Sequence, residues 1–149
     1  MTDRLPHLIL LAHAAATLFM VGVIWFVQVI HYPLLAEVAP ADLPRYEREH
    51  TRRAAWVIGP PMLLELATGI LLLWLSPAGV APWQAVAGLM LLAVVWTSTQ
   101  LVQVPCHTRL SREFDAACVR RLVATNWVRT TAWSLRGLLV LWMCRDTLA

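Results

Sequence analysis

Four long runs of apolar residues, separated by short polar connections, dominate the hydropathy pattern of this chain. They cover about residues 8–30, 54–75, 83–104 and 122–143. Each run has the roughly 20 residues that a helix needs to cross the hydrocarbon core of a bilayer. The pattern therefore predicts an all-α integral membrane protein, with one four-span domain over residues 1–149 folded as an up-and-down four-helix bundle.

The overall composition agrees with this prediction and excludes several classes of protein. Of the 149 residues, 59% are hydrophobic and only 14% are charged, whereas soluble domains carry about 25% charged residues. A water-soluble enzyme is therefore nearly excluded. All 12 basic residues are arginine, so chemistry that needs a lysine Schiff base is excluded as well. The three cysteines form no CxxC pair and have no zinc-site spacing.

The arginines are concentrated in two connections. Residues 31–53 and residues 105–121 carry four arginines each, whereas the opposite side has only Arg4 and Arg145. By the positive-inside rule, both termini lie outside the plasma membrane and the arginine-rich connections lie in the cytoplasm. We expect the lipid bilayer as a partner and no nucleic acid. A homo-oligomer is left open.

Local signals refine the expected helix boundaries. Asp42, with Pro44 in the first turn after it, predicts a short cytoplasmic helical extension that runs into the second span. The Gly59-Pro60-Pro61 segment predicts a kink in that span, because proline removes a backbone donor and clashes with the preceding turn. Pro105 is expected to end the third span, and Asp115 is expected to cap the fourth.

Each predicted span also has a polar face. At 100° per residue, the polar residues of a span gather on a narrow stripe. The stripes consist of His13, Thr17, Gln28 and His31; Glu65 and Thr68; Gln100, Gln103 and His107; and Asn126, Arg129, Trp133 and Arg136. Because polar groups are unfavourable in lipid, these faces are expected to turn inward. They would line a funnel that opens to the cytoplasm.

The mouth of this funnel would hold His31, His50, His107 and Asn126. Glu47 and His50 have the Glu-x-x-His spacing of metal sites in helical bundles, but the chain has no second copy of that spacing. The three histidines, with Glu47 or Glu65, would instead suit a single iron, copper or zinc ion, or a haem. Without a metal they are expected to act as acid/base groups. Interfacial anchoring of each histidine is the alternative.

Glu65 lies in the middle of a span, where a carboxylate is unfavourable unless it is paired. Arg129 lies at a similar depth, so we expect an ion pair between Glu65 and Arg129 or Arg136. Two functional alternatives remain. Glu65 carries protons, or the two arginines bind an anionic or quinone-like substrate through their planar donor groups. We therefore add Glu65, Asn126 and Arg129 to the candidate catalytic set of His31, His50 and His107.

Several short segments resemble the anthrone oxygenase-like family of small four-span membrane proteins. They are His31-Tyr32-Pro33, residues 46–53, Pro105-Cys106-His107 and Asn126-Trp127-Val128-Arg129. The resemblance implies a four-helix membrane fold and oxygenase activity on a hydrophobic aromatic molecule. A fainter similarity, through His13 in the first span, is to four-span haem-dependent protoporphyrinogen oxidases and copper-resistance membrane proteins.

Three functions are compatible with these features. The first is a membrane oxidoreductase or oxygenase that acts on a hydrophobic aromatic or quinoid molecule, with an iron or copper ion or a haem as the cofactor left open. The second is a small proton-coupled transporter in which Glu65 alternately binds a proton and a cation. The third is a non-catalytic membrane assembly subunit whose polar faces hold helices together.

Overall fold

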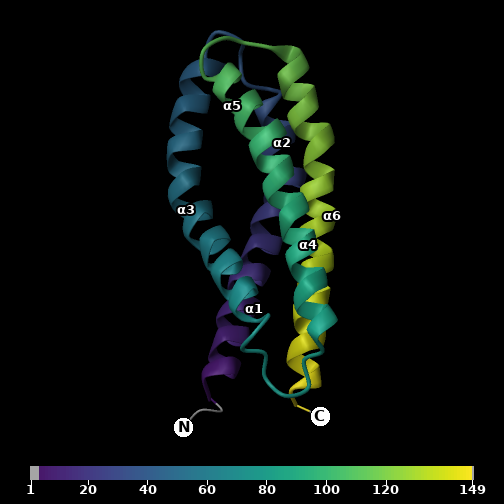
Figure 1. Ribbon diagram of the computed structural model, residues 1–149. Helices are drawn as coiled ribbons and strands as arrows, with labels where there is room; N and C mark the ends of the chain where they lie inside the picture. Colours follow the sequence, from purple (N-terminus) through teal and green to yellow (C-terminus); the bar gives the residue numbers. More distant parts are fainter. Residues whose placement is uncertain (1–3, 149) are drawn as a thin grey trace.

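The computed structural model describes residues 4–148, which form helices and connections without a β-strand. Four long helical segments run along the molecule, and consecutive segments run in opposite directions (Figure 1). They are α1 (Arg4–Phe26) with η1 (Val27–His31) and α2 (Tyr32–Leu35); α3 (Leu43–Leu71); α4 (Pro82–Ser98) with η2 (Thr99–Gln103) and α5 (Val104–Leu110); and α6 (Ala116–Asp146). The start of α1 and the end of α6 lie at one end of the molecule, which we call the terminal end. We call the opposite end the arginine-rich end.

By length and composition, three of the four segments can cross a membrane. They are Arg4–Leu35, Leu43–Leu71 and Pro82–Leu110. The fourth segment, α6, is not among them, although the sequence predicts a span over residues 122–143. Arg129 and Arg136 lower its mean hydropathy, but both side chains are buried among the other helices. The fourth span stays a prediction.

The two aspartates expected to cap helices behave differently. The Asp115 side chain accepts hydrogen bonds from the backbone N–H groups of Ala117 at 2.8 Å and Cys118 at 3.1 Å, so the predicted cap of α6 is confirmed. Asp42 also lies at the N-cap position of its helix, and Pro44 lies in the first turn. The Asp42 side chain, however, makes no capping hydrogen bond.

The prediction that Pro105 ends the third span is wrong. The helix continues through Pro105 to Leu110, and the π-helical turn η2 lies just before the proline. The π-helical turn η1 lies in the same place relative to Pro33. A proline in a helix removes one hydrogen bond and clashes with the carbonyl four residues earlier. The wider π turn gives room for the ring, so each helix continues.

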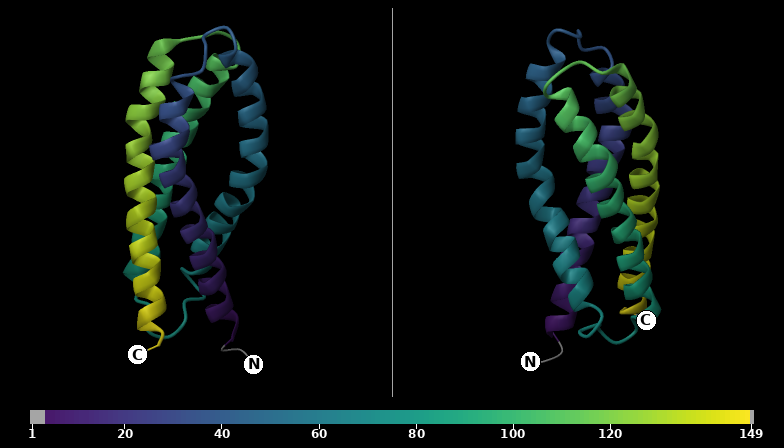
Figure 2. Two further views of the ribbon diagram at one scale, coloured as in Figure 1. Left: turned by 180° about the vertical axis from the view of Figure 1, so that it is seen from behind. Right: turned by 45° about the horizontal axis from the view of Figure 1, so that its top comes forward.

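The predicted disturbance at Pro60 and Pro61 takes the form of a bend, because α3 is one continuous helix that contains both prolines. The helix changes direction near its middle (Figure 1). Both views of Figure 2 show α3 bowed away from the other helices toward its middle, whereas its start packs at the arginine-rich end through Leu43 and Glu47. This bend determines where the cavities of the molecule lie.

The buried apolar residues form three layers along the bundle. One layer lies at the terminal end and includes Leu10, Leu72 and Val140. A middle layer includes Met20, Val95 and Trp133. The third layer, at the arginine-rich end, is built from Tyr32, Leu35, Leu43, Cys106, Leu110, Val119 and Leu122. Buried polar side chains accompany these layers, and they form the two polar clusters described next.

Candidate functional site

A cavity of about 530 Å³ lies between α3 and the α4–α5 segment. Its walls are mainly apolar and include Met20, Ile24 and Met62. Leu63 and Val104 also line the cavity and are exposed on the outside of the bundle. The cavity is therefore open at the side of the bundle, where the bend separates α3 from the neighbouring helices.

The polar side chains of this cavity come from four helical segments. They include Tyr32, His50, Gln103, His107 and Arg129. A second cavity, of about 790 Å³, lies between α1 and α3 and reaches His31 and His50. His50 therefore lines both cavities, one on each side of α3.

The three histidines predicted to converge lie close together. The rings of His31 and His50 stack with their centroids 4.2 Å apart and their planes 18° apart. The ring centroids of His50 and His107 are 5.8 Å apart. Tyr46 stacks on His50 at 6.1 Å. Residues from α3, α5 and the π turn η1 thus form one aromatic cluster near the arginine-rich end.

A chain of hydrogen bonds runs from this cluster into the interior. The Nδ1 atom of His107 lies 2.9 Å from Oε2 of Glu47, which is fully buried. The Nε2 atom of the same ring lies 3.3 Å from the hydroxyl of Tyr32. That hydroxyl also lies 3.1 Å from Oε1 of Gln103, and Nε2 of Gln103 donates to Thr125 at 3.0 Å. Carboxylate, imidazole and phenol are therefore joined in that order.

This arrangement differs from the metal site that the sequence suggests. Over residues 4–148, no group of three or more histidine, cysteine, aspartate or glutamate side chains is arranged to hold a metal ion. Both ring nitrogens of His107 already have partners within the protein. The rings of His31 and His50 lie face to face, whereas metal ligands must direct their nitrogen lone pairs at a shared centre.

Glu65 does not join the histidines, although the sequence suggests that it belongs to the same funnel. It lies fifteen residues after His50 on α3, or about 22 Å along the helix axis. The sequence predicts Arg129 or Arg136 as its ion-pair partner. In the structure the partner is Arg136, whose Nη2 lies 3.1 Å from the Glu65 carboxylate. Glu65 therefore belongs to a second polar cluster.

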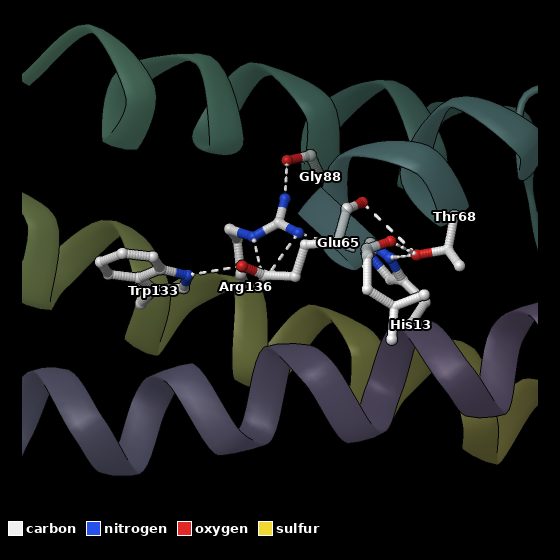
Figure 3. Close-up of polar contacts among 7 residues, drawn as sticks. His13, Glu65, Thr68, Gly88, Trp133 and Arg136 are labelled. Carbon is white, nitrogen blue, oxygen red and sulfur yellow. Dashed lines mark hydrogen bonds and ion pairs between the residues drawn. The ribbon is translucent and has the colours of Figure 1, made fainter. Parts of the chain in front are cut away.

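Figure 3 shows this second cluster, to which α1, α3, α4 and α6 all contribute. The indole nitrogen of Trp133 donates to Glu65 at 3.0 Å. Arg136 also donates to the carbonyl of Gly88 on α4. His13 lies 2.8 Å from the hydroxyl of Thr68 and 3.5 Å from Arg136. The Glu65 carboxylate and the Arg136 guanidinium are thus fully enclosed and hydrogen-bonded.

The remaining predicted site residues, Asn126 and Arg129, lie on the inner face of α6. Asn126 donates to Gln28 on η1 at 2.9 Å, and its own side-chain oxygen has no hydrogen-bond partner among the residues that the structure describes. Arg129 is 7% exposed and lines the 530 Å³ cavity. Both residues therefore lie on the inner face that the stripe predicts for the fourth span.

Sequence reasoning gave no role to Tyr32, which links His107 to Gln103. The sequence does contain a signal that could have identified Tyr32. Its hydroxyl comes directly after His31, at the end of the first apolar run. Gln100 and Gln103, which belong to one predicted stripe, both line the 530 Å³ cavity, but Gln100 is exposed whereas Gln103 is buried. The π turn η2 explains this difference, because it changes the rotation per residue between the two glutamines.

Comparisons with known proteins identified no relative of this chain. No protein-family model, no curated protein and no solved structure matches the chain. The resemblance to the anthrone oxygenase-like family stays an expectation from short segments.

Proposed function

We propose that the protein is a membrane oxidoreductase or oxygenase that acts on a hydrophobic aromatic or quinoid molecule. In this proposal Glu47, His107 and Tyr32 carry out the proton-transfer part of the reaction. The single observation that carries the proposal is the hydrogen-bonded chain from Glu47 to Gln103, which meets the apolar cavity at His107 and Tyr32.

The hydrogen bonds suit a group that gains and loses a proton. An ionised Glu47 only accepts hydrogen bonds, so Nδ1 of His107 carries a proton and Nε2 carries none, which makes it the basic nitrogen of the ring. In that state the Tyr32 hydroxyl donates to Nε2. When Nε2 takes up a proton it donates to the Tyr32 oxygen, and the hydroxyl turns to Gln103. Glu47, His107 and Tyr32 keep a hydrogen-bond partner in both states, as a general acid/base site requires, whereas Oε1 of Gln103 accepts from Tyr32 only in the second state.

The shape of the cavity supports a hydrophobic molecule as the substrate. Pockets for small molecules are mostly apolar, with a few polar groups that fix the orientation of the ligand. Here the side opening is bordered by Leu63 and Val104, which are exposed and apolar. A molecule dissolved in the bilayer would enter by this route and reach His107 at the inner wall.

The second polar cluster favours the oxidoreductase over the proton-coupled transporter. A proton carrier in a membrane has to be released from its partner during each cycle. Glu65 has donors on both oxygens, from Arg136 and Trp133, and is fully buried. We therefore propose a structural role for Glu65.

We also propose that all four helical segments cross the plasma membrane, with both termini outside. The support for α6 as the fourth span is that Arg129 and Arg136 face the interior, while Leu135, Leu138 and Leu141 are exposed. Such an exterior is compatible with lipid. The arginine-rich end, and with it the mouth of the site, would then face the cytoplasm.

Anthrone is a suitable probe of the proposed chemistry, because its methylene carbon loses a proton to give an anthrolate. Dioxygen then converts it to anthraquinone, and the overall reaction consumes one dioxygen and releases one water. Exchange of the methylene protons in D2O without oxygen measures proton transfer alone, and oxygen uptake measures the complete reaction. Both are measured with the purified protein in lipid nanodiscs, together with its absorption spectrum and metal content.

We expect the protein to accelerate the exchange, and His107→Ala and Glu47→Gln to reduce the acceleration by about 100-fold or more. His7→Ala, which changes an exposed histidine at the other end of α1, is the matched control and should leave the rate unchanged. Exchange no faster than with empty nanodiscs would overturn the proposal. A haem band in the absorption spectrum, or one bound metal ion per protein, would show that the reaction depends on a metal rather than on the acid/base groups alone.

A further inference from the structure

We infer that Arg129 is a binding group for the carboxylate of an acidic aromatic molecule that occupies the 530 Å³ cavity. This inference names the substrate class for the proposed function and rests on it. It starts from a buried cation that has no counter-ion among residues 4–148.

Arg129 differs from every other buried charge in the part of the chain that the structure describes. The Glu65 carboxylate pairs with Arg136, and Glu47 lies next to His107. No carboxylate in residues 4–148 lies within ion-pair distance of Arg129, and its Nε–H has no hydrogen-bond partner. A buried charge without a partner is strongly unfavourable, so a ligand anion is the missing counterpart.

The surroundings hold this side chain in place without neutralising it. The Arg129 guanidinium lies over the ring of Trp133, 5.3 Å from the ring centroid. Tyr32 lines the same cavity as Arg129. An aromatic ring orients a guanidinium through cation–π contact. This contact leaves its positive charge available to a ligand.

The position of Arg129 in the cavity relates it to the proposed acid/base site. Arg129, His107 and Tyr32 all line the cavity, and the Tyr32 hydroxyl lies 3.3 Å from His107. An aromatic ring system among Met20, Ile24 and Met62 would therefore place an acidic substituent at Arg129 while its reacting carbon faces His107. This two-point contact fixes the orientation of the substrate.

Among the anions common on aromatic molecules, a carboxylate fits this site best. An unperturbed carboxyl group has a pKa near 4 and is ionised at neutral pH, whereas a phenol has a pKa near 10 and is not. Arginine also presents planar donors that match a carboxylate. The site therefore selects an aromatic acid over its neutral analogues.

The test compares two probes that differ only in charge, anthraquinone-2-carboxylate and anthraquinone-2-carboxamide. Their binding to the protein in nanodiscs is measured by calorimetry, with empty nanodiscs subtracted. We expect the wild type to bind the carboxylate at least tenfold more tightly than the amide. Arg129→Gln should abolish this preference, and Arg129→Lys should retain part of it as a point charge.

Thermal unfolding of the probe-free protein provides an independent readout. Because Arg129 has no counter-ion in the described part of the chain, Arg129→Gln should leave the unfolding midpoint unchanged or raise it, whereas Arg136→Gln should lower it. The inference would be overturned if the wild type bound the two probes with equal affinity. It would also be overturned if Arg129→Gln lowered the affinity for both probes by the same factor. His107→Ala should keep the carboxylate preference while losing proton exchange, so failure of the proposed chemistry is distinguishable from failure of the binding site.

Discussion

Individual polar residues separate into two clusters with different chemistry. Around Glu65, each charged atom of the carboxylate has a donor from Arg136 or Trp133. Around His107, the groups are connected but incompletely satisfied, since Oε1 of Glu47 and Nε2 of His31 have no hydrogen-bond partner within residues 4–148. Fully satisfied buried networks make a structure rigid, and incompletely satisfied ones mark positions where a ligand or a proton is handled.

At this scale we predict that Glu65→Ala destabilises the protein by about 3–5 kcal/mol, because it leaves the buried Arg136 guanidinium uncompensated. The unfolding free energy is measured in detergent with denaturant. The double variant Glu65→Ala/Arg136→Ala should recover a substantial part of the loss. If the double variant loses the sum of the two single effects, the residues are not energetically coupled and the ion pair is not the cause.

At the scale of secondary-structure elements, π-helical turns and helix caps decide where the polar side chains point. η1 and η2 both precede a proline and both contribute to the site, through His31 and Gln103. The helix of the third segment continues past Pro105, which is what brings His107 to Glu47. A helix that ended at the proline would have left His107 in a connection.

The cap of α6 gives a prediction about pH at the same scale. Hydrogen bonds from the Cys118 and Ala117 N–H groups hold the pKa of Asp115 below its usual value, although partial burial opposes them. A carboxylate with a lowered pKa contributes stability that is present above its unfolded pKa, near 3.9, and is lost as the pH falls through the folded pKa. We therefore expect Asp115→Ala to lower the unfolding midpoint at pH 7, with the difference from wild type disappearing in acid.

Asp42→Ala is the matched control for this experiment. Asp42 occupies the same position on α3, but its side chain makes no capping hydrogen bond. The unfolding midpoint of Asp42→Ala should equal the wild-type value both at pH 7 and in acid. An equal decrease in the two variants would show that the effect comes from charge at a helix end rather than from the cap.

At the scale of the whole molecule, the bend of α3 creates the two cavities that flank it. The terminal half of α3 packs against α1 through Gly69, whose missing side chain leaves room for the His13 ring. Toward its middle the helix bows away from its neighbours (Figure 2), and it returns to them at the arginine-rich end through Leu43 and Glu47. One helix therefore provides both the rigid ion pair and the open site.

The expected topology gives a prediction for the intact chain. A reporter fused after Gly79 should report from outside the cell, and a reporter placed within residues 110–117 should report from the cytoplasm. The physical reason is the excess of arginine at one end of the bundle. Paired alkaline phosphatase and green fluorescent protein fusions check this in cells. Cytoplasmic fluorescence from the Gly79 fusion would contradict the proposed orientation.

The sequence by itself determined the helical class, the residues that face inward and the convergence of His31, His50 and His107. Hydropathy and helical periodicity are local properties, and burial of polar stripes follows directly from them. The stripe on α6 is an example, because Asn126, Arg129, Trp133 and Arg136 are all buried as its periodicity predicts.

Only the tertiary structure decided which polar groups are partners. Arg136, not Arg129, reaches Glu65, because the choice depends on how far α3 and α6 slide past each other. Similarly, the π turns set the rotation of Gln103 and the continuation of the helix to His107. Tyr32 joins the site because its hydroxyl extends from α2 to the α4–α5 segment. Axial offset, helix rotation and side-chain reach depend on packing between distant segments, and periodicity along one helix carries no information about them.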